Sequence, residues 1–210
     1  MSAEIYLTVF TTVTALVSIV SFLAARSAIS KEISSRVKLD VTLDQMREHE
    51  QKVKIFLDEH NISAGTDIHV IAQTLNVTKG GEEPGLKSLA HLSDPDENGR
   101  MVVTFQPGLS PEATLFALAH ECAHLVNKDS TPADRPHGYN KPQIEQLADY
   151  TAAALLMPLD AVYTFLTQGS YKRQSPRKRM VMVRQLCKTY GVDEIIVLRR
   201  IQEVYDLKGF

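Results

Sequence analysis

The spacing of apolar residues along the chain predicts a helical protein with two central helices. Within Leu115–Val126 the apolar side chains recur at helical spacing, and Ser110 and Pro111 supply an N-cap and a proline suited to the first helical position. Pro142–Met157 shows a second pattern of the same kind. The polar residues 127–141 between them include several turn-forming types, which predicts an exposed loop.

Shorter patterns flank these two helices. Thr42 and Gln45 have the spacing of a capping box ahead of a further helix. Two short strands are predicted, at Leu86–Leu92 and Met101–Phe105, whereas Lys79–Gly85 is charged and expected to be partly flexible. Other helices are predicted over Asp67–Leu75, Leu159–Leu166, Arg177–Tyr190 and Asp193–Val204. The predicted fold class is therefore α+β and mainly helical, with a small antiparallel sheet.

The N-terminal segment Ile5–Ala25 differs from the rest because its 21 residues include no charged side chain. This is about the length that an α-helix needs to cross a membrane. A secretory signal peptide is the main alternative, but no lysine or arginine precedes the segment, and signal peptides normally begin with a basic region. We therefore predict one transmembrane helix, with a helix of the protein core as a further alternative.

Charged residues after this segment predict its orientation. Residues 26–38, directly after the segment, include four basic residues and one acid, Glu32. The basic residues are Arg26, Lys31, Arg36 and Lys38. The positive-inside rule then places the larger part of the chain on the cytoplasmic side of the cell membrane, after a single pass.

Composition limits the remaining possibilities. The net charge of −2 argues against direct binding to nucleic acid. The two cysteines, Cys122 and Cys187, offer no disulfide framework, which suits a reducing compartment. The chain is expected to comprise a transmembrane helix (1–25), a juxtamembrane linker and helix (26–60) and one domain (61–210).

The first predicted central helix carries the pentapeptide His120-Glu121-Cys122-Ala123-His124. Two histidines one helical turn apart can both bind a Zn²⁺ ion, while the glutamate between them faces the water that the metal activates. Glu121 is therefore the candidate general base for peptide-bond hydrolysis.

A catalytic zinc ion needs a third protein ligand. Glu145 and Asp149 stand four residues apart on the second predicted helix, so they share one face of it. Glu145 is the candidate third ligand. Asp149 is the candidate acceptor for the second ring nitrogen of a ligand histidine, which would fix the tautomer of that histidine.

The loop between the two helices contains His137 and Tyr139. Either side chain can donate a hydrogen bond to a developing oxyanion opposite the metal, and a solvated position is the alternative for each. They are the candidate oxyanion stabilisers.

The order of these motifs resembles that of the ImmA/IrrE family of zinc metallopeptidases. The resemblance spans Phe105–Pro158 and includes the apolar approach to His120, the E-x-x-A-D motif from Glu145 to Asp149, and Ala154–Pro158, which is similar to the A-x-L-L-M-P ending of the family. Leu147 stands where many relatives have another acid, and Cys122-Ala123 replaces a frequent Leu-Gly. Neither departure removes a ligand. A hydrophobic segment opens the chain where the family has a helix-turn-helix domain.

This resemblance implies a zincin-like, gluzincin-type metallopeptidase domain that acts on a protein. Similar proteins cleave or inactivate DNA-binding repressors, so the expected substrate is a cytoplasmic transcriptional repressor. One alternative is a zinc-containing anti-repressor that sequesters its partner without cleavage, although a structural zinc site has no need of the base Glu121. The other is a secreted metallopeptidase.

Overall fold

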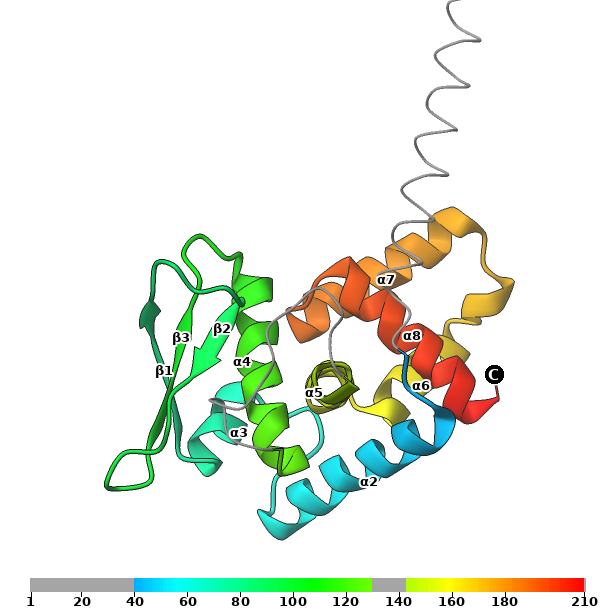
Figure 1. The fold of residues 1–210 in the computed structure, drawn as a ribbon. Helices are drawn as coiled ribbons and strands as arrows, with labels where there is room; N and C mark the ends of the chain where they lie inside the picture. The colour runs from blue at the N-terminus through cyan, green and yellow to red at the C-terminus, as the bar shows by residue number, and fades with distance from the viewer. Residues whose placement is uncertain (1–39, 130–142, 210) are drawn as a thin grey trace, which may run out of the picture. The chain divides into compact units, whose positions relative to one another are not determined.

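The structure, a computed structural model, describes residues 40–129 and 143–209 (Figure 1). The predicted transmembrane segment Ile5–Ala25 lies outside these residues, and so do His137 and Tyr139. Within the described ranges no helix is both long enough and apolar enough to cross a membrane. The described residues 40–129 and 143–209 belong to one structural unit.

Helices make up most of this unit, together with three strands. The helices are α2 (Leu43–Glu59), α3 (Ile68–Thr74), α4 (Pro111–Asn127), α5 (Gln143–Leu156), α6 (Leu159–Gln168), the short 3-10 helix η2 (Tyr171–Arg173), α7 (Pro176–Tyr190) and α8 (Glu194–Lys208). The strands are β1 (Val77–Glu82), β2 (Ala90–Leu92) and β3 (Met101–Phe105). The α+β, mainly helical class is confirmed.

Local signals place the helix starts. The capping box at α2 is complete, with the side chain of Thr42 accepting from Gln45 N and that of Gln45 accepting from Thr42 N. At α4 the side chain of Ser110 accepts from Ala113 N at 3.1 Å, and proline follows it. Each cap satisfies amide groups that a helix N-terminus leaves without an intrahelical partner.

The sheet is mixed, so the prediction of an antiparallel sheet is wrong for the pair formed by β1 and β3. Its strand order is β1-β3-β2, with β2 antiparallel to β3 and β1 parallel to β3. Strand β1 includes part of the segment that was expected to be flexible. A Cβ atom on Gly80 would lie 2.7 Å from Val102 Cγ1 and 3.0 Å from the carbonyl oxygen of Val103. Glycine therefore permits the close approach of β1 to β3, at a position where the sequence shows no strand alternation.

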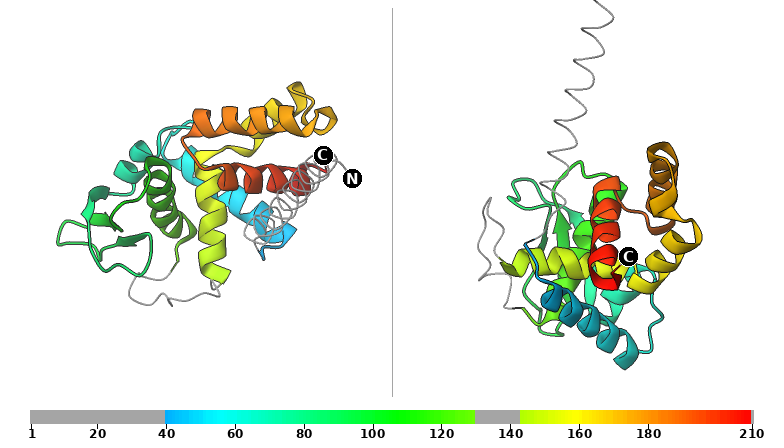
Figure 2. Two further views of the ribbon diagram at one scale, coloured as in Figure 1. Left: turned by 90° about the horizontal axis from the view of Figure 1, so that it is seen from above. Right: turned by 90° about the vertical axis from the view of Figure 1, so that its right-hand side faces the viewer.

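Helix α4 separates the sheet from most of the other helices. The strands lie on one side of α4, and helices α5 to α8 lie on the other (Figure 1). Seen from above, α5 lies between α4 and α8 (Figure 2, left). Helices α4 and α5 contact each other and carry fully buried alanines, namely Ala119 and Ala123 on α4 and Ala148 and Ala152 on α5. Small side chains let two helices approach closely, which brings the polar groups of α4 and α5 within reach of each other.

Helix α2 belongs to the same unit. Val53, Phe56 and Leu57 join the main hydrophobic core. The buried ring of His49 contacts Asn127 Oδ1 of α4 at 3.0 Å and Thr151 Oγ1 of α5 at 2.8 Å. The helix that was expected in the juxtamembrane region 26–60 thus packs directly against the two helices that carry the motifs.

Candidate metal centre

The two motif histidines project from the same face of α4. Their Nε2 atoms lie 3.1 Å apart, and their ring planes are close to perpendicular, at 83°. Residues four apart on a helix share a face, so this pairing follows from the sequence spacing and the helical backbone. The Nε2 atom of each ring therefore points to a common position.

Glu145 reaches that position from α5. Its Oε2 atom lies 3.2 Å from His120 Nε2, and its Oε1 atom lies 3.5 Å from His124 Nε2. A tetrahedral Zn²⁺ ion with ligand bonds of about 2.0–2.1 Å separates its donor atoms by roughly 3.3 Å. His120, His124 and Glu145 thus form a group of three potential metal ligands with the spacing of a zinc site.

The outer ring nitrogens of both histidines contact aspartates. His120 Nδ1 lies 2.8 Å from Asp149 Oδ1, as predicted for the outer contact of a ligand histidine. His124 Nδ1 lies 2.8 Å from Asp129 Oδ2. An ionised carboxylate only accepts hydrogen bonds, so each Nδ1 donates to its aspartate. When the rings are neutral, as metal ligands are, this leaves the lone pair of each Nε2 for the metal.

The position of Asp129 depends on the end of α4. Lys128 adopts a left-handed conformation (φ 60°, ψ 40°), and Asp129 N donates to the carbonyl oxygen of His124 at 3.0 Å. This reversal returns the Asp129 side chain to the ring of His124. A left-handed conformation costs a non-glycine residue about 1–2 kcal/mol, so the turn is a local strain that the rest of the fold supports.

Charge and burial favour a cation at this centre. Burial lowers the pKa of His120, but hydrogen bonds to Asp149 and Glu145 and the charges of Asp149 and Glu121 outweigh it and raise that pKa to about 9. The negative charge of these carboxylates can equally stabilise a divalent metal ion.

Burial and the charge of Glu121 raise the pKa of the Cys122 thiol to about 12, and its side chain lies in the hydrophobic core. Cys122 is therefore a packing residue and is not part of the donor set.

A cleft of about 490 Å³ opens beside the centre. One face of α4 forms one wall of the cleft and contributes Ala113, Phe116, Ala117, His120 and Glu121. Ala113 to Glu121 covers about 12 Å along a helix axis, the length of three to four extended residues. The other walls are residues 87–90 beside β2 and the start of α8, with Ile195, Ile196 and Arg199. The cleft therefore has the length and the largely apolar walls that suit an extended peptide.

Among the described residues strand β2 has an open outer edge, because it is the last strand in the order β1-β3-β2. Leu89 O accepts from Gln106 N, directly after β3, and Ser93 N donates to Val102 O of β3. The alternation of an antiparallel pair then turns the backbone groups of Ala90 and Leu92 away from β3. Consistent with this, the Ala90 carbonyl accepts from Ser88 Oγ at 2.6 Å. Strand β3 is paired on both sides, so it offers no free edge to a further strand.

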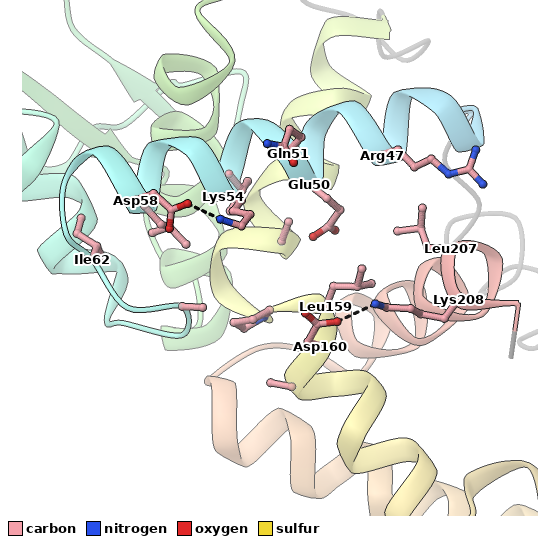
Figure 3. A pocket seen from close by; sticks show the side chains of 16 residues that line it. Arg47, Glu50, Gln51, Lys54, Asp58, Ile62, Leu159, Asp160, Leu207 and Lys208 are labelled. Atoms are coloured by element: carbon pink, nitrogen blue, oxygen red, sulfur yellow. Dashed lines mark hydrogen bonds and ion pairs between the residues drawn. The ribbon is translucent and has the colours of Figure 1, made fainter.

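A second hollow, of about 570 Å³, lies between α2, α6 and the end of α8 (Figure 3). Glu50 extends into it from α2, and the ion pairs Lys54–Asp58 and Lys208–Asp160 border it. None of the three potential ligands lines this hollow, and neither does Glu121. The smaller cleft is therefore the one associated with the centre.

Sequence patterns missed two charged groups at the centre. Asp129 follows His124 by five residues, and only the left-handed turn at Lys128 shows that it returns to the ring. Arg199 comes from α8, fifty residues after Asp149, and its Nη1 atom lies 3.6 Å from Asp149 Oδ2. No sequence spacing links Arg199 to the motif.

Comparison with known proteins agrees with this geometry. A family model for the IrrE N-terminal-like domain, Peptidase_M78, matches residues 65–202. The match contains the three potential ligands, both aspartates and Arg199. The search of curated proteins gave no match to this chain.

Proposed function

Since this chain belongs to the IrrE N-terminal-like family, Peptidase_M78, and so carries a metallopeptidase-like domain, we propose that it is a zinc-dependent peptidase. In this proposal His120, His124 and Glu145 hold the metal and Glu121 is the general base. The observation that carries it is the convergence of two Nε2 atoms and a carboxylate on one position, 3.1–3.5 Å from one another. The donor set of two histidines and one glutamate is one that zinc peptidases use.

When bound, a zinc ion would act as a Lewis acid and lower the pKa of water at the centre to about 7. The residues of the chain then have separate tasks. Asp149 and Asp129 hold the two rings in orientation through Nδ1. Glu121, which is only 6% exposed and lines the cleft, accepts the proton of the attacking water and delivers it to the leaving amine.

The open edge of β2 supports a proposal for how a substrate binds. An extended segment can add to β2 as a further strand, so that its backbone pairs with Ala90 and Leu92 and its side chains alternate into the cleft. Apolar walls at Leu89, Phe116 and Ile195 favour apolar side chains there. A protein substrate with an exposed, extended segment fits this arrangement.

Chelation tests the proposed activity. Purified full-length protein should cleave its substrate protein, lose that activity when a chelator removes zinc, and regain it when zinc is added back. Product fragments are measured by mass spectrometry. A zinc-loaded protein that binds its partner tightly and leaves it intact would instead favour an anti-repressor that acts by sequestration.

For the cellular role, we propose a membrane-anchored enzyme whose domain faces the cytoplasm and cleaves a transcriptional repressor there. The uncharged segment Ile5–Ala25 and the basic residues that follow it support the anchor and its orientation. An intact repressor should accumulate in cells that carry Glu121→Gln protein, as seen by comparing whole proteomes. An unchanged proteome would argue against a cleaved repressor.

Labelling of Ser170→Cys by an impermeant reagent outside intact cells would exclude the cytoplasmic orientation.

A further inference from the structure

We propose that Arg199 is a positioning residue for the metal centre, acting on His120 through Asp149. This inference rests on the proposed zinc function. It adds a third layer to the site: Arg199 holds the aspartate, the aspartate holds the histidine, and the histidine binds the metal. Helix α8 thereby contributes a residue to the site, in addition to those that α4 and α5 provide.

The two oxygens of Asp149 have different partners. Oδ1 lies 2.8 Å from His120 Nδ1, whereas Oδ2 lies 3.6 Å from Arg199 Nη1. A carboxylate with a charged group on each oxygen cannot rotate without weakening one contact. At 3.6 Å the Arg199 contact is an ion pair and exceeds ordinary hydrogen-bond length, so its effect on orientation is mainly electrostatic.

Burial gives this ion pair its importance. The side chains of Arg199 and Asp149 are only 10% and 5% exposed. By contrast, Arg184 pairs with Glu194 at the surface, where the two side chains are 71% and 45% exposed. Exposed pairs contribute little because water and salt screen them, whereas a charge left behind after one partner of a buried pair is removed is strongly unfavourable. Loss of Arg199 should therefore disturb Asp149.

The neighbouring arginine has a different task. Arg200 is fully buried and contacts Glu50 Oε1 at 2.7 Å and Glu203 Oε2 at 3.1 Å, and its Nε donates to the carbonyl oxygen of Met157 at 2.8 Å. These contacts join α8 to α2 and to the end of α5. Arg199 instead lines the cleft with His120, Glu121 and Asp149. Successive residues of a helix point in different directions. Arg200 therefore links α8 to the neighbouring helices, whereas Arg199 points to the metal centre.

Metal binding by the full-length protein tests the assignment. We expect Arg199→Met to weaken zinc affinity about 10-fold, at the lower end of the range for groups that support a metal ligand from outside. The visible spectrum of the cobalt-substituted protein should also change, because a less constrained His120 alters the ligand geometry. Arg199→Lys, which keeps a positive charge, should restore part of both properties. Arg184→Met removes an exposed arginine and should change neither.

Kinetics and a double variant separate positioning from a general loss of structure. Arg199→Met should lower kcat with little change in KM for the substrate. In an Asp149→Asn background it should cause little further loss of zinc affinity, because the group through which it acts is already altered. Circular dichroism verifies folding, and Arg199→Gln replaces the methionine variant if that variant unfolds.

Wild-type zinc affinity and an unchanged cobalt spectrum in folded Arg199→Met or Arg199→Gln would overturn the proposal. The metal measurements need no peptidase activity. A protein that binds zinc, responds to Arg199 as expected and cleaves nothing would refute the proposed peptidase and leave the positioning role intact. A wild-type protein that binds neither zinc nor cobalt would overturn both.

Discussion

Glu121→Gln should abolish most peptide cleavage while leaving zinc binding and the fold intact. The amide is nearly the same size as the carboxylate, so the cleft keeps its shape. It cannot accept a proton from water at neutral pH, and loss of a general base typically lowers kcat by about 100- to 10,000-fold. Product formation under single-turnover conditions and the zinc content of the purified variant are the two measurements.

A matched control is Gln73→Glu, the opposite exchange of amide and carboxylate at an exposed position of α3 that does not line the cleft. It should retain the activity, since Gln73 has no assigned role in proton transfer or substrate binding. Near-normal cleavage by the Glu121→Gln protein would show that another group removes the proton, and the assignment of Glu121 would be wrong.

His124→Ala should lose zinc as well as activity. It removes one of three ligands and leaves the Asp129 carboxylate without its contact to Nδ1. Zinc at 100 times its dissociation constant stabilises a protein by about 2.7 kcal/mol, which corresponds to roughly 5–10 °C in Tm for a domain of this size. Added zinc should therefore raise the Tm of the wild-type protein and leave that of His124→Ala unchanged.

Metal analysis after dialysis provides the direct measurement for this variant. His69→Ala is its control, because His69 is exposed on α3 and does not belong to the group of potential ligands. A His124→Ala protein that retained stoichiometric zinc and the same rise in Tm would place the metal elsewhere. The metal assignment would then fail even if the chain remained a peptidase.

Several elements were predictable because their signals lie within a few residues. The capping box of Thr42 and Gln45, the N-cap at Ser110 and the spacing of His120 and His124 depend on backbone geometry over one or two helical turns. The same is true of Glu145 and Asp149, whose shared face on α5 follows from their separation of four residues. For these groups the sequence predicted which side chains could act together.

Strand β1 shows why other elements could not be predicted. Its sequence contains two glycines and two charged residues, and alone it has no reason to be extended. It is a strand because it pairs with β3, more than twenty residues later, where Gly80 allows the close contact. The same pairing makes β3 the central strand and β2 an outer strand, an arrangement that the two predicted strands alone did not indicate.

The candidate metal ligands could therefore be predicted from the local spacing of the histidines and carboxylates, since a helix places residues four apart on one face. The charged residues that support these ligands could not be predicted in this way. Asp129 required a left-handed turn at Lys128, and Arg199 required α8 to pack beside α5. Long-range packing brings such groups together, and its free energy comes from buried surface that no short segment contains. The sequence alone thus specified the candidate ligands and the candidate general base, and the folded chain determined how these groups are oriented and where the cleft beside them opens.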